Sequence, residues 1–576
     1  MITLDVDGRT VEAQAGETIL TVLRREGIHV PTLCHMDGLP PSGACRMCVV
    51  EVEGSPSLTP SCSFPVAQGM KVKTSTPRVL EARRTIVKLL LASHPDDCLY
   101  CNSNGHCDLQ KLAQDLGVRE RVYRGPRRVQ EMDMSSPAIV RDPAKCILCG
   151  RCVRMCEEIQ GVAAIDFIGR GSRAKIGTAF DGGLNVSTCV NCGQCVNVCP
   201  TGALSERCYI DDVITALNDP TKRVVVQHAP SVSVSLAEEF GSPAGKDVDG
   251  QMVTALRRLG FHRVFDTAFS ADLTIMEEGS ELVHRIKTGG KLPMFTSCSP
   301  GWIKFIETFY PQLLPNVSSC KSPQQMLGAL IKTFFAEREG VDPANIVSVS
   351  IMPCTAKKFE CARPEMSRNH VPDVDYVLTT RELGRMLHQF GVNLAALEPS
   401  AADTPFGERS SAGKIFGTSG GVMEAAIRSA HFLITGRELE DLKIQPLRGL
   451  KGCKELHVEV DGIKLGAAVV SGLGNARKIL DEVVAGRDDL QFIEIMTCPG
   501  GCINGGGQPK NIDPAAIEAR MKALYKIDRD APLRTSHSNP WIQRIYKEYL
   551  GQPLGEKSHA LLHTHYTMRN IPITNG

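Results

Sequence analysis

The cysteines of this chain constrain it more than any other feature. The sequence has 23 cysteines among 576 residues, and 15 of them lie before residue 200, in tight groups. The first residues, MITLDVDGRTVEA, lack the basic and apolar regions of an export signal, so we expect a cytoplasmic protein. In a reducing compartment, grouped cysteines are typical of metal ligands rather than of disulfides. The sequence therefore predicts a protein that carries metal.

The overall composition excludes two broad classes of protein. Lysine and arginine number 65 against 64 acidic residues, for a net charge of +1, which argues against a general nucleic-acid binder. The sequence has no apolar run of about 18 residues, so we expect no membrane span. Hydrophobic residues make up 42%, as in globular proteins, and the length predicts roughly three to five domains.

Two of the cysteine groups repeat one spacing. Cys146 to Cys156 and Cys189 to Cys199 each follow the pattern C-x2-C-x2-C-x3-C, and Pro200 ends the second run. This doubled spacing is typical of proteins with two 4Fe–4S clusters, in which the fourth cysteine of each run ligates the other cluster. A pair of structural zinc sites is the alternative. We expect one cluster on Cys146, Cys149, Cys152 and Cys199, and the other on Cys156, Cys189, Cys192 and Cys195.

Two further groups precede these runs. The first offers four thiolates in a β-rich segment, enough for a 2Fe–2S cluster, although its first gap is wider than in plant-type ferredoxins and a zinc ribbon is the alternative. The second offers one imidazole and three thiolates, which indicates a His/Cys3 4Fe–4S cluster or, alternatively, zinc. Four clusters in 200 residues predict a chain of electron-transfer sites. The two groups are Cys34, Cys45, Cys48 and Cys62, and His94, Cys98, Cys101 and Cys107.

The hydrophobic pattern divides the chain in the same way. Residues 1–78 alternate apolar and polar, with Asp7-Gly8 as a hairpin signal, and residues 79–92 have helical periodicity. From about residue 224, β-rich runs such as Arg223–Gln227 alternate with helical runs such as Val422–Ala430, which indicates α/β layers. The tail from about residue 530 is polar and helical.

Three segments of the second half carry the remaining chemistry. They are Phe295-Thr-Ser-Cys-Ser-Pro-Gly-Trp302, Ile351-Met-Pro-Cys-Thr-Ala-Lys-Lys358 and Glu494-Ile-Met-Thr-Cys-Pro-Gly-Gly-Cys-Ile-Asn-Gly-Gly-Gly-Gln-Pro509. Together, and in this order, they closely resemble the signature motifs of FeFe-hydrogenases. The resemblance extends along the whole chain. The N-terminal half looks like the accessory-cluster region of the long, clostridial-type enzymes, which is also shared with a large subunit of respiratory complex I.

The resemblance implies an H-cluster, which is a 4Fe–4S cubane joined through one cysteine to a di-iron site with CO, cyanide and a bridging dithiolate amine. It implies that Cys354, Cys498 and Cys502 ligate the cubane and that Cys502 bridges to the di-iron unit. Lys357 would offer an ammonium group to a cyanide ligand. The positions that match the lining of the family's pocket are Pro230, Ser231, Gln324, Met352, Phe416 and Met496.

The chain departs from the family pattern at one ligand. The family usually has two adjacent cysteines in the first motif, of which the first relays protons and the second ligates the cubane. Here the pair is Cys298-Ser299. Three possibilities remain open: Ser299 ligates as an alkoxide, Cys298 takes over the ligation, or the cubane is abnormal. A serine oxygen is a harder ligand than a thiolate and matches iron–sulfur chemistry less well.

A proton route is indicated by helical spacing and by the resemblance. Glu278, Glu281 and Arg285 stand at i, i+3 and i+7 of a predicted helix, so they share one face. Helix spacing alone favours a solvated salt-bridge face. The resemblance reverses this preference, because these positions match the family's Glu–Glu–Arg relay, with Ser318 as the hydroxyl between them. Each group must lie within hydrogen-bond reach of the next.

We therefore predict an α+β multidomain fold. The expected parts are a 2Fe–2S ferredoxin-like β-grasp domain (1–78), a His/Cys3 4Fe–4S module (79–125), a bacterial ferredoxin-like module with two 4Fe–4S clusters (126–210), an α/β H-cluster domain of the FeFe-hydrogenase kind (211–510) and a helical C-terminal segment (511–576).

Other motifs carry weaker predictions. The Gly-x-Gly turn after Ala467–Ser471 has Arg477 where a dinucleotide site needs a small residue, so we do not predict nucleotide binding there. The histidines of HALLHTHY near the end of the chain favour a docked helix with interfacial histidines. Four isolated cysteines are expected to be buried structural thiols, and they are Cys208, Cys320, Cys361 and Cys453.

The predicted activity is the interconversion of H2 with protons and electrons at the H-cluster, at an enzyme of the FeFe-hydrogenase class. Accessory clusters would pass electrons to ferredoxin or to a partner. Because no flavin or nicotinamide site is evident, a link to NAD(P) requires separate flavoprotein subunits in a hetero-oligomer. The alternative is a non-catalytic hydrogen sensor or an electron-conducting scaffold, and Ser299 is the residue that keeps it open.

Overall fold

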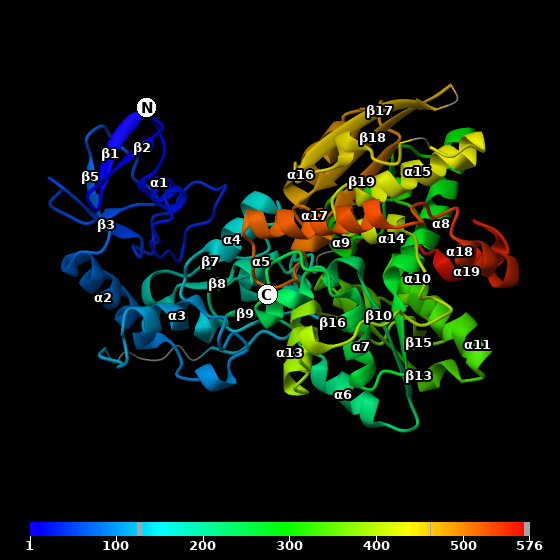
Figure 1. Cartoon of the computed structure of the whole chain (residues 1–576), viewed down its shortest axis with the longest axis horizontal. Helices are drawn as coiled ribbons and strands as arrows, with labels where there is room; N and C mark the ends of the chain where they lie inside the picture. The colour runs from blue at the N-terminus through cyan, green and yellow to red at the C-terminus, as the bar shows by residue number, and fades with distance from the viewer. Residues whose placement is uncertain (124–129, 440, 461, 570–576) are drawn as a thin grey trace.

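The computed structural model describes residues 1–123, 130–439, 441–460 and 462–569. Figure 1 shows a small β-rich module at one end, the cysteine-rich modules beside it, and a large α/β body that makes up the rest of the molecule. The predicted boundary between the second and third modules, at residues 125 and 126, lies outside the described residues.

The N-terminal module is a mixed sheet with one helix. Its strand order is β2-β1-β5-β3-β4, with β1 antiparallel to β2 and parallel to β5. Asp7-Gly8 makes the tight turn between the first two strands, as predicted, with Asp7 at φ 50° and Gly8 at φ 85°. The elements are β1 (Ile2–Val6), β2 (Arg9–Ala13), α1 (Ile19–Arg25), β3 (Val49–Val52), β4 (Thr59–Pro60) and β5 (Lys71–Lys73).

Short elements between long loops build the next two modules. Helix α2 begins after Thr76, whose hydroxyl accepts a hydrogen bond from the Val79 amide at 3.3 Å, and it ends next to His94. Strands β6 and β9 pair antiparallel and join the two ends of the ferredoxin-like module. The elements are α2 (Pro77–Ser93), α3 (Asp108–Asp115), β6 (Ile139–Arg141), α4 (Arg151–Arg154), β7 (Asp166–Ile168), β8 (Lys175–Gly177), α5 (Gln194–Val198) and β9 (Leu204–Glu206).

Two four-stranded sheets form the frame of the large body. The first is parallel throughout, in the order β11-β10-β13-β16, and the second has the order β12-β19-β18-β17, with only β17 antiparallel to its neighbour. The strands are β10 (Arg223–His228), β11 (Arg263–Asp266), β13 (Ile346–Met352), β16 (Tyr376–Thr379), β12 (Met294–Phe295), β17 (Cys453–Val460), β18 (Ile463–Ser471) and β19 (Phe492–Met496).

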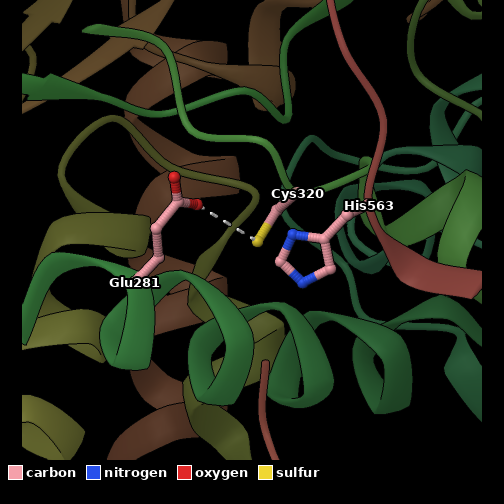
Figure 2. A group of neighbouring side chains, drawn as sticks. All are labelled: Glu281, Cys320 and His563. Carbon is pink, nitrogen blue, oxygen red and sulfur yellow. Dashed lines mark hydrogen bonds between the residues drawn. The ribbon is translucent and has the colours of Figure 1, made fainter. Parts of the chain in front are cut away.

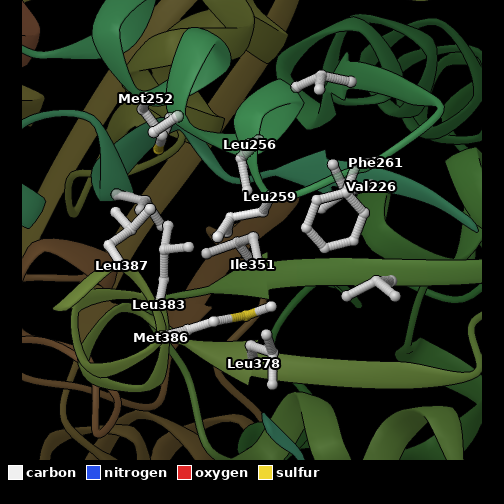
Figure 3. Close-up of a cluster of buried hydrophobic side chains, with 14 of the residues drawn as sticks. Val226, Met252, Leu256, Leu259, Phe261, Ile351, Leu378, Leu383, Met386 and Leu387 are labelled. Atoms are coloured by element: carbon white, nitrogen blue, oxygen red, sulfur yellow. The ribbon is translucent and has the colours of Figure 1, made fainter. Parts of the chain in front are cut away.

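Helices cover both sheets. Figure 3 shows one of these layers, in which Met252 and Leu256 of α7 and Leu383 and Met386 of α13 share a buried cluster with Ile351 of β13. The helices of the body are α6 (Ile210–Asn218), α7 (Asp249–Arg258), α8 (Thr267–Thr288), α9 (Pro300–Phe309), α10 (Pro323–Leu330), α11 (Ala336–Glu339), α12 (Ala356–Cys361), α13 (Thr380–Gln389), α14 (Ser411–Ile415), α15 (Gly421–Thr435) and α16 (Leu473–Val484).

The C-terminal segment packs on the body through the helices α17 (Pro514–Asp530), α18 (Pro540–Ile545) and α19 (Glu556–Leu562). A buried charge cluster fastens α17, because Arg428 of α15 pairs with Asp528 at 2.9 Å and with Glu424 at 2.6 Å. Within the described ranges, the structure contains no helix of the length and apolarity that a membrane crossing requires.

Candidate functional site

A cavity lies where the strand ends of both sheets meet. The segments after β10, β12, β13 and β19 all contribute to its wall, and its empty volume is about 780 Å³, including space open to solvent. The carboxyl ends of parallel strands are the usual position of ligand sites in α/β proteins. All three motifs of the second half, far apart in the sequence, therefore contribute to one cavity.

Four cysteines line this cavity, and they are Cys298, Cys354, Cys498 and Cys502. Burial raises the pKa of the Cys502 thiol to about 12, and it raises the pKa of Cys354 and Cys498 as well. Thiols at such pKa values stay protonated unless a cation compensates the buried thiolate charge. This donor set fits a metal cofactor with soft ligands.

A second observation supports a bulky ligand here. The Ser231 side chain is fully buried at the cavity wall, and its hydroxyl has no hydrogen-bond partner among the described residues. Buried hydroxyls are nearly always paired, so this donor is available to a group in the cavity. The other predicted pocket residues, Pro230, Gln324, Met352, Phe416 and Met496, line the same cavity.

A glycine-rich loop closes the cavity on the side of the ferredoxin-like module. A Cβ atom on Gly505 would stand 2.1 Å from the Pro353 carbonyl, and one on Gly506 would stand 2.1 Å from the Cys192 carbonyl. Only glycine permits these approaches. The loop thereby brings Cys192 near Cys498. Burial raises the pKa of Cys192, and the charge of Cys498 raises it further.

Cys298 and Ser299, the pair that departs from the family pattern, lie at the cavity wall. Their two side chains have different surroundings. The Ser299 hydroxyl lies 2.7 Å from the Thr497 hydroxyl and accepts a hydrogen bond from the Thr497 amide at 3.2 Å. Burial raises the pKa of the Cys298 thiol, and the nearby Glu278 raises it further. The serine thus faces the segment of Cys498, whereas the cysteine lies near Glu278.

Lys357 reaches the cavity wall with all three of its donor positions in use. Its ammonium donates to the Ser322 hydroxyl at 2.6 Å, to a Glu360 carboxylate oxygen at 2.8 Å and to the Cys298 carbonyl at 3.3 Å. Sequence reasoning missed Glu360 as its partner, although the i, i+3 spacing on α12 was a usable signal. A cofactor that takes a hydrogen bond from Lys357 must displace one of these acceptors.

The predicted relay residues lie together beside the cavity. The Ser318 hydroxyl donates to Glu281 at 2.8 Å, and Arg285 donates to the other oxygen of Glu281 at 2.6 Å. Burial, with a contribution from Glu281, raises the pKa of Glu278 to about 8, although hydrogen bonds from the Ser297 amide and the Ser318 hydroxyl oppose the shift. Glu278 therefore holds a proton at neutral pH.

Sequence reasoning missed several residues around Glu281. Ser319 donates its amide to Glu281 at 3.1 Å, and its hydroxyl lies 2.8 Å from the Nδ1 atom of His563. The Cys320 thiol lies 4.0 Å from the same carboxylate. Among the isolated cysteines, Cys320 is buried as predicted, whereas Cys208 is exposed, so the prediction of a buried thiol was wrong there. Its position in a loop before α6 leaves it at the surface.

The two ferredoxin-like runs form two separate groups of four. One small cavity is lined by Cys156, Cys189, Cys192 and Cys195. A second is lined by Cys146, Cys149, Cys152 and Cys199. Each group thus takes three cysteines from one run and the fourth from the other, which is the exchange that the spacing predicts.

The two N-terminal groups are arranged differently. The thiols of the first group lie close enough to shift one another's pKa, and the group is Cys34, Cys45, Cys48 and Cys62. The Cys45 amide donates to the Cys34 sulfur at 3.5 Å. In the second group, burial raises the pKa of Cys107, and Cys101 adds to the shift. Burial lowers the pKa of His94, which keeps its imidazole neutral, as a metal ligand must be. Cys98 is exposed.

A cavity joins three of these groups. Its wall includes Cys45, His94, Cys146 and Cys149, so it borders the first, second and third groups at once. Cys101 of the second group also lies close to the segment after Cys199, because a Cβ atom on Gly202 would stand 2.5 Å from the Cys101 sulfur.

Five family models match consecutive segments of the chain. Residues 222–506 match the iron only hydrogenase large subunit, C-terminal domain, and residues 514–569 match the iron hydrogenase small subunit. Residues 1–77 match a 2Fe-2S iron-sulfur cluster binding domain. Residues 83–121 match the NADH-ubiquinone oxidoreductase-G iron-sulfur binding region, and residues 136–205 match the ferredoxin-like domain of NADH-quinone oxidoreductase subunit 3.

Two curated relatives span the whole chain. The chain is 47% identical to the NADP-reducing hydrogenase subunit HndD of Solidesulfovibrio fructosivorans, over 99% of both proteins. It is 40% identical to iron hydrogenase 1 of Clostridium pasteurianum, over 98% of this chain and 100% of the relative. The solved structure of apo [FeFe]-hydrogenase HydA1 from Chlamydomonas reinhardtii superposes with a TM-score of 0.57 at 44% identity, covering 63% of this chain and 99% of that one.

Proposed function

Because the chain belongs to the FeFe-hydrogenase family, we propose that it catalyses the reversible oxidation of H2 to protons and electrons. The observation that carries this proposal is the cavity in which Cys354, Cys498 and Cys502 meet at the strand ends. A non-catalytic electron scaffold has no use for this cavity, for a buried Ser231 hydroxyl that no described residue pairs with, or for the glycine loop.

The cavity residues fit an H-cluster. Cys354, Cys498 and Cys502 would hold the cubane, with Cys502 as the bridge to the di-iron unit. When bound, the cofactor would supply an open iron position for H2 and an amine base beside it. Lys357 would orient the di-iron unit through its ammonium, and the Ser231 hydroxyl would donate a further hydrogen bond.

The surroundings of Cys298 and Ser299 favour a division of roles. Cys298 lies near Glu278, which suits a thiol that passes protons between the cavity and the relay. Ser299 lies against Thr497, next to Cys498, which suits the fourth ligand position of the cubane. We therefore propose Ser299 as the oxygen ligand and Cys298 as the relay thiol.

Protons would then travel along α8. From Cys298 they would pass to Glu278, then through the Ser318 hydroxyl to Glu281 and to the surface at Arg285. The ion pair between Glu281 and Arg285, at 2.6 Å, holds the Glu281 carboxylate in place for this transfer. A buried acid with a pKa near neutral pH is the most efficient donor and acceptor.

Electrons would travel through the N-terminal half. We propose one 2Fe–2S cluster and three 4Fe–4S clusters besides the H-cluster. The cluster on Cys156, Cys189, Cys192 and Cys195 would stand first, because Cys192 neighbours Cys498. The cluster on Cys146, Cys149, Cys152 and Cys199 would follow. Beyond it the path would branch to the His94 cluster and the 2Fe–2S cluster, since one cavity borders all three groups.

The partners would dock near the ends of these branches. Leu99 and Tyr100 stand 84% and 88% exposed between Cys98 and Cys101, so the His94 group has an apolar surface next to its ligands. We propose that ferredoxin and flavin- and NAD(P)-binding subunits receive electrons here or at the 2Fe–2S module, in a hetero-oligomer. The name of the relative from Solidesulfovibrio fructosivorans supports NADP as the acceptor.

Infrared spectroscopy on anaerobically matured protein tests the proposal. Metal-bound CO and cyanide give bands in a region free of protein absorption, and we expect them together with H2 turnover. If the bands are absent, the protein has no H-cluster and the proposal fails. If they appear without turnover at any pH, the protein is a sensor rather than an enzyme.

A further inference from the structure

Three buried side chains near the relay form a group that the proposed reaction does not use as a whole. Glu281 comes from α8, Cys320 from the loop before α10, and His563 from the residue after α19. Figure 2 shows the Cys320 sulfur between the carboxylate and the imidazole. The ligand atoms of these three residues all lie within 4.8 Å of one another. We call this group the Glu–Cys–His triad.

The chemistry of the triad matches a borderline divalent cation. A thiolate, an imidazole and a carboxylate are the three ligand types that Zn²⁺ binds, and three protein ligands leave one position for water. Bond lengths of about 2.0–2.3 Å place tetrahedral ligand atoms about 3.5 Å apart. The Cys320 sulfur already lies 4.0 Å from the Glu281 oxygen, so small side-chain movements close the triad around an ion.

The surrounding residues hold two of the three ligands, His563 and Glu281, in place. The Nε2 atom of His563 lies 3.1 Å from a Glu277 oxygen, and the Tyr546 hydroxyl donates to the other oxygen of Glu277 at 2.6 Å. In Figure 2 the other ring nitrogen of His563 faces the Cys320 sulfur. A carboxylate that holds the remote nitrogen of a ligating histidine is a recurrent feature of zinc sites. Arg285 fixes Glu281 in the same way, from the opposite oxygen.

The charge around the triad also suits a cation. Glu277 and Glu281 bring two buried carboxylates, and Arg285 is the only permanent cation that the described residues place in hydrogen-bond contact with either of them. A divalent ion that displaces the thiol proton of Cys320 enters this negative environment with a net gain of one positive charge. His563 gives up its 2.8 Å hydrogen bond to Ser319 in exchange for a metal bond.

We propose that Glu281, Cys320 and His563 form a binding site for a Zn²⁺-class cation, and that the bound ion stops proton transfer through Glu281. The binding half stands on the geometry alone. The inhibitory half rests on the proposed hydrogenase function, because it requires Glu281 to relay protons. A carboxylate oxygen bonded to a dication no longer accepts a proton at neutral pH.

Zinc titration of the anaerobically matured holoenzyme tests both halves. Zinc K-edge absorption reports the zinc ligands without interference from iron. We expect one tightly bound ion per chain with a single sulfur neighbour and nitrogen or oxygen neighbours. Each rate of H2 evolution is normalised to the same protein without zinc, and we expect it to fall as this site fills.

Two variants and one control locate the ion. Cys320→Ser removes the sulfur neighbour from the zinc spectrum, and His563→Gln keeps a polar side chain but loses the imidazole. We expect each to raise the zinc concentration for half-inhibition at least about 100-fold, since one ligand of three is lost. Cys361→Ser, another lone cysteine of the same body, keeps the native zinc response.

The outcomes separate the site from the function. A sulfur neighbour that persists in Cys320→Ser, or an unchanged zinc response in both variants, overturns the binding site. Zinc bound with the expected ligands but without effect on the rate overturns the inhibitory half, and the relay role of Glu281 with it. The infrared bands of the H-cluster, measured on the same samples, decide the hydrogenase function independently. Iron content and cluster absorption of each variant show that it is folded.

Discussion

Replacement of Glu278 by glutamine gives the sharpest test of the proton route. The Glu278 side chain is only 1% exposed, and its pKa of about 8 stands 3.5 units above its ordinary value of 4.5. At about 1.36 kcal/mol per unit, ionising this carboxyl costs about 5 kcal/mol more than in water. At pH 7 most molecules therefore hold this proton. Glu278→Gln keeps the shape but cannot exchange a proton, so we expect H2 evolution to fall about 10²- to 10⁴-fold.

Infrared difference spectroscopy checks the magnitude directly. A protonated buried carboxyl gives its own C=O band, and we expect a band that titrates with a midpoint near pH 8 and is missing in Glu278→Gln. Glu278→Asp is the matched control, because it keeps a titratable group one methylene shorter and should recover part of the rate. A carboxyl band that is already absent at pH 7, or a Gln variant with native turnover, refutes the reasoning.

The raised pKa of Glu278 also makes the stability of the fold depend on pH. The folded state binds the Glu278 proton more tightly than the unfolded state does, so between pH 4.5 and about 8 the folded state holds more protons. The free energy of unfolding therefore falls as pH rises through this window, by up to about 5 kcal/mol from this group. Denaturant unfolding of Glu278→Gln should lack this decline.

Three further predictions concern other parts of the chain. Ser299→Ala should leave the cubane with three protein ligands and a labile iron, seen as loss of one iron by Mössbauer spectroscopy, and a full cubane would exclude Ser299 as a ligand. Gly506→Ala forces the loop away from the ferredoxin-like module, so the magnetic coupling between the H-cluster and the proposed cluster at Cys192 should weaken. Gly279→Ala is the control, because its added Cβ makes only an ordinary 3.8 Å contact and should leave the coupling unchanged. Arg428→Met removes one of three arginines around the buried Asp528 carboxylate, and Arg448 at 3.2 Å and Arg534 at 3.1 Å remain. We therefore expect a loss of stability below the roughly 3–5 kcal/mol of a buried charge left without any partner, measured by denaturant unfolding, with faster proteolysis of α17 than in the native chain.

The cysteine spacing was a strong guide to the site because it is a local signal. In the two ferredoxin-like runs, three cysteines of each group come from one short loop, so their spacing alone predicts how they group. The cavity behaves differently. Cys354 and Cys498 are 144 positions apart, and only the parallel strand order of β13 and β19 in two separate sheets explains their meeting. Resemblance to a known family, and not spacing, made that part predictable.

The surroundings of Glu281 could not be predicted because they depend on long-range packing. Periodicity placed Glu278, Glu281 and Arg285 on one helix face, which α8 confirms. Periodicity gave no sign of His563, which lies 244 positions from Ser319 in the sequence. The two residues meet only because the C-terminal segment docks beside α8. Nor could it show that Cys320 lies at the carboxylate, since a lone cysteine looks the same in sequence wherever it is buried.

The glycine loop ties the cavity to the ferredoxin-like module, so the proposed electron path and the cavity cannot vary independently. Gly505 packs on the segment that carries Cys354, and the adjacent Gly506 packs on the carbonyl of Cys192 in the ferredoxin-like module. Gln194 and Asn197 of that module donate to the carbonyls of Asn504 and Gly505 at 2.8 and 3.1 Å. One loop thus carries Cys502, packs on the segment of Cys354 and sets the distance between the cavity and the Cys192 group. A side chain added anywhere along it should disturb cofactor binding and electron transfer together, and a substitution that changed only one of them would show that the two are less tightly joined than this packing requires.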